Sequence, residues 1–333
     1  MYRGRSFREK ILENLERSFS GLLSAQTVNA ISGVSSDLSS EASSFWGYEL
    51  PLSSSQAKCD FLFCVHRPDQ FPINNDIDWV KPFESVLDWW RNQSDPASQG
   101  INNIWFEFDQ KDLISTPQSS FFFGPDKNLS TMALVDLTVQ VLEMVQPNIF
   151  SSALLQKLFR LHRDLPQNVW ISQIGLMLPR NVRGLRIFTQ RIQWGDAKNL
   201  LRSHEYPGDL DLVLRFWSLM EVHKARVEMN IDLLPELGGT VGLEAYFDAM
   251  ENALAFLLAM EPHIRSEKKD ALIAFMSNLQ FDETHDSQAF FSHFKVSINA
   301  SLETKFKAYF GKADNDVARK IIRTKPLEKP MSC

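Results

Sequence analysis

Several short segments of this chain alternate between polar and apolar residues, and this alternation limits the possible folds more than any other feature. The clearest runs are 104–109, 226–232, 293–299 and 305–310, and weaker alternation is found at 184–192. Successive side chains of a β-strand point to opposite faces of the sheet. Each run therefore predicts a strand with one apolar face and one polar face.

The polar faces of these predicted strands hold acids, bases and large aromatic side chains together. If these faces converge on one lumen, we expect an acidic side formed by Glu107, Asp109, Glu228 and Asp232. We expect a basic side formed by Arg186, Arg226, Lys295 and Lys307. The same faces carry Trp105, His293 and Tyr309, so they combine the residue types from which ligand sites are built.

The rest of the chain predicts helices that alternate with pairs of strands. Strands are expected at 59–66, 103–109, 169–178, 184–192, 225–234, 292–299 and 304–310. Helices are expected at 5–24, 82–92, 129–145, 151–163, 195–204, 241–260 and 266–279, and 210–224 fits either a strand or a helix. Loops are expected at 30–44 and around 121–125, and Glu244 is placed in the first turn of a helix.

Length and composition indicate one folded domain. The chain has 333 residues, of which 44% are hydrophobic and 23% are charged, as in globular proteins. We expect a single α+β domain over 1–312, followed by a polar tail over 313–333. Cys59 and Cys64 are expected to be reduced packing residues, which fits a reducing compartment.

Charge and hydropathy argue against two classes of partner. The net charge of −6 gives no general attraction for nucleic acid. No run approaches the roughly 18 apolar residues of a membrane span, and the N-terminal segment lacks the apolar stretch of a signal peptide. We therefore expect a cytoplasmic protein with neither nucleic-acid nor membrane partners.

Two architectures are consistent with the alternation. An antiparallel sheet with one face in water shows the same pattern. Alternatively, the sheet curls into an antiparallel β-barrel of repeated ααββ units, with helices outside and a polar lumen. A barrel of about ten strands is wide enough to hold a ligand.

Two strands carry local motifs that resemble a known enzyme family. The run Lys307-Ala308-Tyr309 is similar to the Lys-x-Tyr strand of the ABBA-type aromatic and peptide prenyltransferases, and His293-Phe294-Lys295 is similar to a neighbouring basic strand of that family. The resemblance spans residues 100–310. It lacks the second Lys-x-Tyr strand found in many members.

The resemblance implies transfer of an isoprenoid group from an allylic diphosphate to an aromatic or peptide acceptor. It implies Glu107 as the residue that contacts the acceptor and takes its proton. It also implies a substrate site, with a Mg²⁺ ion as an optional companion of the diphosphate, formed by Arg186, Arg226, Lys295, Lys307, Tyr309, Trp105, His293 and Glu228.

Two other functions stay open at this point. The chain could be a non-catalytic protein that binds a peptide or a partner through the polar face of its sheet. It could also belong to another enzyme class that uses a Glu/Lys/His site on that sheet. The sequence has no recognised metal-binding motif that would decide between them.

Overall fold

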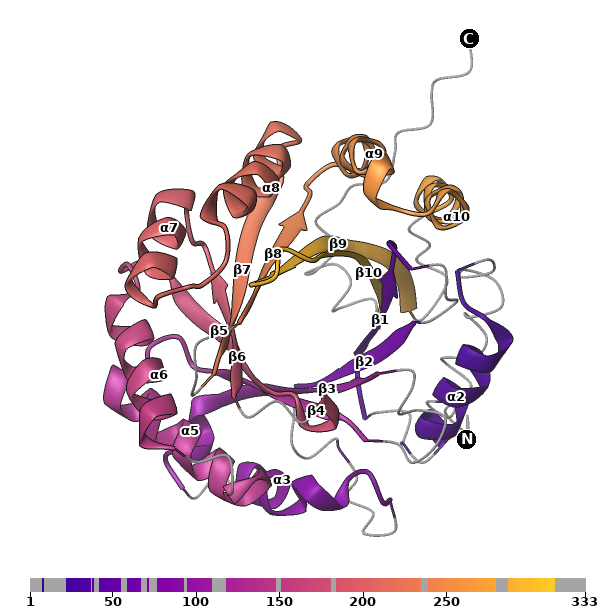
Figure 1. Ribbon diagram of the computed structural model, residues 1–333. Helices are drawn as coiled ribbons and strands as arrows, with labels where there is room; N and C mark the ends of the chain where they lie inside the picture. Colours follow the sequence, from indigo (N-terminus) through magenta and orange to yellow (C-terminus); the bar gives the residue numbers. More distant parts are fainter. Residues whose placement is uncertain are drawn as a thin grey trace.

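The computed structural model describes ten strands that close into an antiparallel barrel (Figure 1). It describes residues 8, 22–36, 38, 42–54, 59–66, 71, 77–92, 95–109, 118–147, 151–180, 184–234, 239–279 and 287–314. The strands are β1 (Phe45–Pro51), β2 (Asp60–Val65), β3 (Ile101–Phe108), β4 (Ser120–Pro125), β5 (Trp170–Leu176), β6 (Leu185–Gln190), β7 (Arg226–Leu233), β8 (Thr240–Tyr246), β9 (Ser287–Asn299) and β10 (Thr304–Asp314).

Each strand pairs with its neighbours in sequence, and the pairing of β1 with β10 closes the ring. At this seam Gly47 lies opposite Gly311, and Glu49 lies opposite Tyr309. The barrel prediction is therefore confirmed, and the flat sheet with one solvated face is excluded. Closure also removes the exposed strand edges that an open sheet would present.

The described α-helices surround the barrel, and each of the last three helix pairs is followed by a pair of strands (Figure 1). They are α2 (Ala25–Ser36), α3 (Glu84–Arg91), α5 (Thr131–Val145), α6 (Ser152–Asp164), α7 (Trp194–Ser203), α8 (Leu210–Val222), α9 (Met250–Ala259) and α10 (Ser266–Ser277). Several begin at N-cap side chains: Ser130 and Ser151 each accept a hydrogen bond from a backbone N–H of the first turn.

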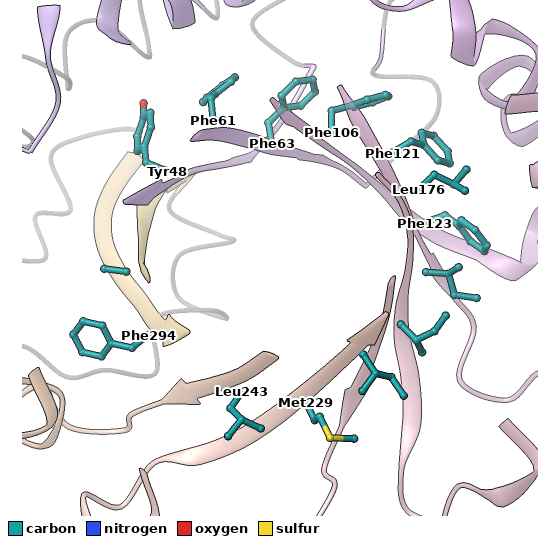
Figure 2. Close-up of a cluster of buried hydrophobic side chains, with 14 of the residues drawn as sticks. Tyr48, Phe61, Phe63, Phe106, Phe121, Phe123, Leu176, Met229, Leu243 and Phe294 are labelled. Atoms are coloured by element: carbon teal, nitrogen blue, oxygen red, sulfur yellow. The ribbon is translucent and has the colours of Figure 1, made fainter. Parts of the chain in front are cut away.

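The hydrophobic core lies between the barrel wall and these helices. Figure 2 shows Tyr48, Phe61, Phe63, Phe106 and Phe121 on the outer face of neighbouring strands, pointing away from the lumen. Their rings pack at centroid separations of 5.3–5.9 Å, which is the contact range of aromatic pairs. Because one strand face is committed to this core, the other face must line the lumen.

Three predicted elements were wrong. The serine-rich segment 30–44 was expected to be a loop, but α2 extends through Ser36 and buries Ile31 and Val34 on one face. Residues 121–125 were also expected to be a loop, but they form β4, which is buried along its whole length and so shows no alternation. The expected helix 241–260 is strand β8 followed by helix α9.

The ambiguous segment 210–224 is a helix. Asp209 caps it by accepting hydrogen bonds from the backbone N–H groups of Asp211 and Leu212. Val213, Phe216 and Met220 are buried at helical spacing. The other strands and helices expected between 59 and 310 are confirmed with boundaries that shift by up to five residues.

Parts of the predicted organisation lie outside the described residues. The expected helix at 5–24 falls almost entirely there, as does the chain beyond Asp314, to which β10 extends. In the described part, Cys59 and Cys64 are buried and form no disulfide. No helix there is long and apolar enough to span a membrane.

The close approach of β1 and β10 generates a prediction about barrel closure. A Cβ atom on Gly311 would lie 2.3 Å from the Trp46 carbonyl oxygen and 2.8 Å from the Gly47 Cα atom. Both are backbone atoms, so Gly311→Ala must push the two strands apart. We expect it to lower the free energy of unfolding by about 1–3 kcal/mol in denaturant titrations.

Gly195→Ala is the matched control for this substitution. Nothing lies within 4 Å of a Cβ atom at Gly195, which lies in α7. Because alanine favours helix over glycine, this variant should be as stable as the wild type or more stable by about 0.5–1 kcal/mol. Equal stability of the Gly311→Ala variant and the wild type would contradict the described seam.

Candidate active site

The barrel lumen contains a cavity of about 560 Å³, and each of the ten described strands contributes to its wall. This volume is typical of sites that bind small organic molecules. Much of the wall is aromatic, with the rings of Phe45, Trp105, Phe122, Trp170, Phe188, Tyr246, Phe290 and Tyr309. The polar lining includes Glu107, Glu228, Glu244, His293 and Lys295.

Buried charges in the lumen are arranged as acid–base pairs. Removing an ion from water costs several kcal/mol unless an opposite charge lies nearby. Lys295 Nζ lies 3.1 Å from Glu244 Oε1, and Arg186 Nε donates to Asp232 Oδ1 at 2.7 Å. The remaining pairs are Lys307 with Glu49, Arg226 with Glu228, and Arg180 with both Glu107 and Asp109.

A second layer of charges lies next to the cavity along the barrel axis. Phe188 and Tyr309 line the cavity, whereas Arg186 and Lys307, which lie two residues earlier on the same strands, do not. Residues two apart in a strand share a face. Arg186 and Lys307 therefore occupy the next inward-facing layer of the lumen, adjoining the end of the cavity marked by Lys295.

Glu49 is the most deeply buried acid of this layer, with 2% of its side chain exposed. Burial alone would raise the pKa of its carboxyl group, but Lys307, Lys295 and Arg180 together lower that pKa to about 2. Tyr309 donates a further hydrogen bond to it. Glu49 is therefore ionised at neutral pH and stabilises the cations around it.

Arg180 holds two acids at one side of the lumen. Its guanidinium donates to Asp109 Oδ2 at 2.8 Å and to Glu107 Oε1 at 2.9 Å. Burial lowers the pKa of Arg180, but Asp109 and Glu107 outweigh that effect and raise it above its ordinary value. Glu107 thus faces the cavity as a carboxylate anchored by Arg180.

Glu244 is the acid at the opposite side of the cavity. It accepts hydrogen bonds from Asn230 Nδ2 at 3.1 Å and from the Tyr246 hydroxyl at 2.9 Å. Burial would raise the pKa of its carboxyl group, but Lys295 and His293 lower it below its ordinary value. Glu244 is therefore a second buried carboxylate, already supplied with hydrogen-bond donors.

The structure brings most of the predicted site residues together. Residues Trp105, Glu107, Glu228, His293, Lys295 and Tyr309 line the cavity. Arg186 and Lys307 lie in the adjoining charged layer, and the side chain of Arg226 is 37% exposed at the start of β7. The catalytic and binding roles predicted for these residues stay predictions.

The predicted separation into an acidic side and a basic side is wrong. Arg186 contacts Asp232, and Arg226 contacts Glu228 on its own strand. Coulomb attraction in a poorly hydrated lumen places opposite charges next to each other. The lumen is consequently a mosaic of ion pairs.

Three charged residues of the lumen were missed from the sequence. Glu49 lies on β1, a strand that the sequence did not predict, and Glu244 was assigned to a helix but points into the lumen from β8. Arg180 follows β5 in a short 3₁₀ turn over Leu178–Arg180. The signal that could have revealed β8 is its alternation, in which every second side chain is apolar and faces outward, as Val241, Leu243 and Ala245 do.

The described residues contain no ready-made metal site. In the described part of the chain, no three His, Cys, Asp or Glu side chains form a group that could hold a metal ion. A Mg²⁺ ion bound together with a diphosphate stays a prediction, since the phosphate oxygens would supply some of its ligands.

Comparison with solved structures identifies the fold of this chain. No protein-family model and no curated protein sequence matches the chain. The apo form of the prenyltransferase PriB superposes with a TM-score of 0.63 at 13% sequence identity, covering 98% of this chain and 100% of that one. The chain has the ABBA prenyltransferase fold.

Two tryptophan prenyltransferases share the ABBA barrel. The 6-dimethylallyltryptophan synthase from Micromonospora olivasterospora gives a TM-score of 0.56 at 10% identity, covering 97% of this chain and 100% of that one. The 5-dimethylallyltryptophan synthase from Streptomyces coelicolor gives 0.55 at 11% identity, covering 91% and 97%. At sequence identities this low, the likeness establishes a shared fold only. That fold agrees with the α+β barrel predicted from the sequence.

The pairing of Glu49 with Lys307 across the ABBA barrel seam generates a second prediction. Lys307→Met removes the main partner of a buried carboxylate while keeping an unbranched side chain. We expect the free energy of unfolding to fall by about 3–5 kcal/mol, measured by denaturant titration at pH 7.

The double variant Glu49→Gln/Lys307→Met is the control for this experiment. It removes both charges and should recover a large part of the lost stability, because no ion is then left unpaired. A single variant as stable as the wild type would show that the ion pair makes no net contribution to closing the barrel.

Proposed function

We propose that this protein is a prenyltransferase that moves an isoprenoid group from an allylic diphosphate to an aromatic or peptide acceptor. One observation carries the proposal: Lys295 and Tyr309 meet at the end of an aromatic-walled cavity, next to a layer of further cations. The barrel fold shared with known prenyltransferases supports it.

The donor diphosphate would bind at the charged end of the cavity. Lys295 lines that end, and Lys307 and Arg186 lie close enough to lower its pKa, after the larger effect of burial. Ionisation of an allylic diphosphate develops negative charge on the departing phosphates, which fixed cations stabilise. On this proposal, the lysines exchange their contacts with Glu244 and Glu49 for contacts with phosphate.

The isoprenoid chain would occupy the aromatic part of the cavity. Lys295 Nζ already lies 5.0 Å from the centroid of Phe188 and 5.9 Å from that of Tyr309. Aromatic faces that stabilise an ammonium group also stabilise a carbocation. The same rings limit access of water, which would otherwise trap the cation as an alcohol.

The acceptor would be held by Glu107. Its carboxylate faces the cavity beside Trp105 on the same face of β3, and Arg180 fixes its orientation. An aromatic N–H or O–H group could donate a hydrogen bond to it. Solved complexes of similar barrels contain tryptophan or brevianamide F together with a donor analogue, which supports an aromatic acceptor here.

A second candidate function is ligand binding without catalysis. Five cations in or next to the cavity each contact at least one carboxylate, whereas Lys127 at the cavity wall lies over the Trp170 ring. Such a lumen has less positive charge to offer a phosphate than one with unpaired lysines. A barrel of this kind could hold a neutral aromatic molecule or a peptide segment without ionising any donor.

Glu107→Gln tests the proposed function. Arg180 keeps its contacts with Asp109, so the variant should fold. Loss of a hydrogen bond to a charged group amounts to about 1.5–3 kcal/mol, so the KM for the acceptor should rise about tenfold or more. The assay measures transfer from dimethylallyl and geranyl diphosphate to tryptophan and to cyclic dipeptides that contain it.

Glu303→Gln is the matched control, because Glu303 is an exposed acid outside the cavity that pairs with Lys305. Its kinetic constants should equal those of the wild type. An unchanged acceptor KM in Glu107→Gln would exclude Glu107 from acceptor binding. A wild-type protein that binds the acceptors but releases no diphosphate would favour the non-catalytic function.

A further inference from the structure

A β-bulge places two adjacent polar residues of β9 in the cavity wall. Opposite β9, Tyr309 pairs with His293 and the next residue, Phe310, pairs with Phe291, so Ser292 is the extra residue. Both Ser292 and His293 line the cavity. A bulge re-aims side chains that regular alternation would send to opposite faces.

The imidazole ring of His293 is held rigidly in this position. It stacks on Tyr309 with a centroid separation of 4.3 Å and an interplanar angle of 12°. Its other neighbour is the Tyr246 ring, at 4.5 Å. Ser292 Oγ lies 2.8 Å from Nδ1, which fixes the rotation of the ring within the stack.

The second ring nitrogen of His293 has no hydrogen-bond partner among the residues that the structure describes. His293 is 8% exposed, so Nε2 is a buried polar atom. Buried polar atoms are nearly always hydrogen-bonded, so an exception in a cavity wall is an atom that can bond to whatever occupies the cavity. The closest charged atom recorded near Nε2 is Glu244 Oε2, at 3.8 Å.

The surroundings keep His293 neutral at physiological pH. Burial lowers its pKa to about 4, Glu244 and Glu49 oppose that shift, and Lys295 and Arg226 reinforce it. When Nδ1 donates its hydrogen to Ser292 Oγ, the Nε2 lone pair is available. Once Nε2 takes up a proton, the carboxylate of Glu244 stabilises the resulting imidazolium.

We propose that Nε2 of His293 removes the ring-carbon proton of the aromatic acceptor during prenyl transfer. This inference rests on the proposed function. The C–O bond of the allylic diphosphate breaks, and the diphosphate leaves with the electron pair. A carbon of the acceptor ring forms the new C–C bond, the C–H electrons return to the ring, and the proton moves to Nε2.

The three glutamates that line the cavity are less suited to this step, and Glu228 is paired with Arg226. Glu244 already receives hydrogen bonds from Asn230 and Tyr246 and contacts Lys295. Glu107 is bound to Arg180, and β2, β1 and β10 separate its strand from β9. Glu107 would therefore hold an N–H or O–H group of the acceptor, while His293 acts at a ring carbon.

His293→Gln tests the assignment, since an amide keeps the polarity of the site but cannot take up a proton at neutral pH. Single-turnover experiments follow release of diphosphate and formation of prenylated product separately. We expect diphosphate release within about threefold of the wild type and product formation reduced by roughly 10²-fold or more. The missing product should appear as prenyl alcohol.

Isotope substitution separates a proton-transfer role from a merely structural one. With an acceptor deuterated at the reacting carbon, the isotope effect on product formation should be larger in His293→Gln than in the wild type. Wild-type product formation in the variant, or loss of diphosphate release together with transfer, would overturn the proposal. A wild-type protein that releases no diphosphate would contradict the proposed function itself.

A measurement on the wild type covers the case in which the variant does not fold. Nitrogen NMR of the histidine rings should show His293 as the neutral Nδ1–H tautomer at pH 7, titrating with a pKa near 4. An Nε2–H tautomer or a charged ring at pH 7 would overturn the proposal, because Nε2 would then have no lone pair to offer.

Discussion

Neutralisation of buried charge inside the barrel is the constraint on which the rest of the structure depends. Ten strands point one face inward, and those faces carry charged groups that water can hydrate only poorly. Most of the described lumen cations therefore contact a carboxylate, as Lys307 contacts Glu49 and Arg186 contacts Asp232. Several pairs join different strands, so the loss of one partner would leave an uncompensated charge buried in the wall.

The barrel divides the protein into two environments with different physical roles. Outside the wall, aromatic and aliphatic side chains pack against the helices and supply most of the hydrophobic stabilisation (Figure 2). Inside, a cavity adjoins the charged layer at the end marked by Lys295. A ligand that enters this cavity meets preorganised charges, and its binding depends on how readily the ion pairs exchange partners.

The inward–outward pattern of the later strands could be predicted because their polar and apolar residues alternate cleanly, as in β7 and β10. Glu244 could not be placed in the same way, because glycines precede it and resemble a turn before a helix. Glu49 lies between Tyr48 and Leu50 in a strand whose inward face includes the small Gly47, which weakens the alternation. Partners such as Arg180 depend on three-dimensional closure that local patterning does not encode.

The most direct test of the lumen as a diphosphate site is calorimetric titration with dimethylallyl S-thiolodiphosphate, a donor analogue that resists ionisation. Lys295→Ala removes the buried lysine of the cavity wall, and Lys305→Ala removes a lysine of β10 whose side chain is 60% exposed. We expect binding to weaken by about tenfold or more in the first variant and to stay unchanged in the second. Equal affinity of the wild type and Lys295→Ala, or no binding to the wild type, would contradict a diphosphate site in this lumen.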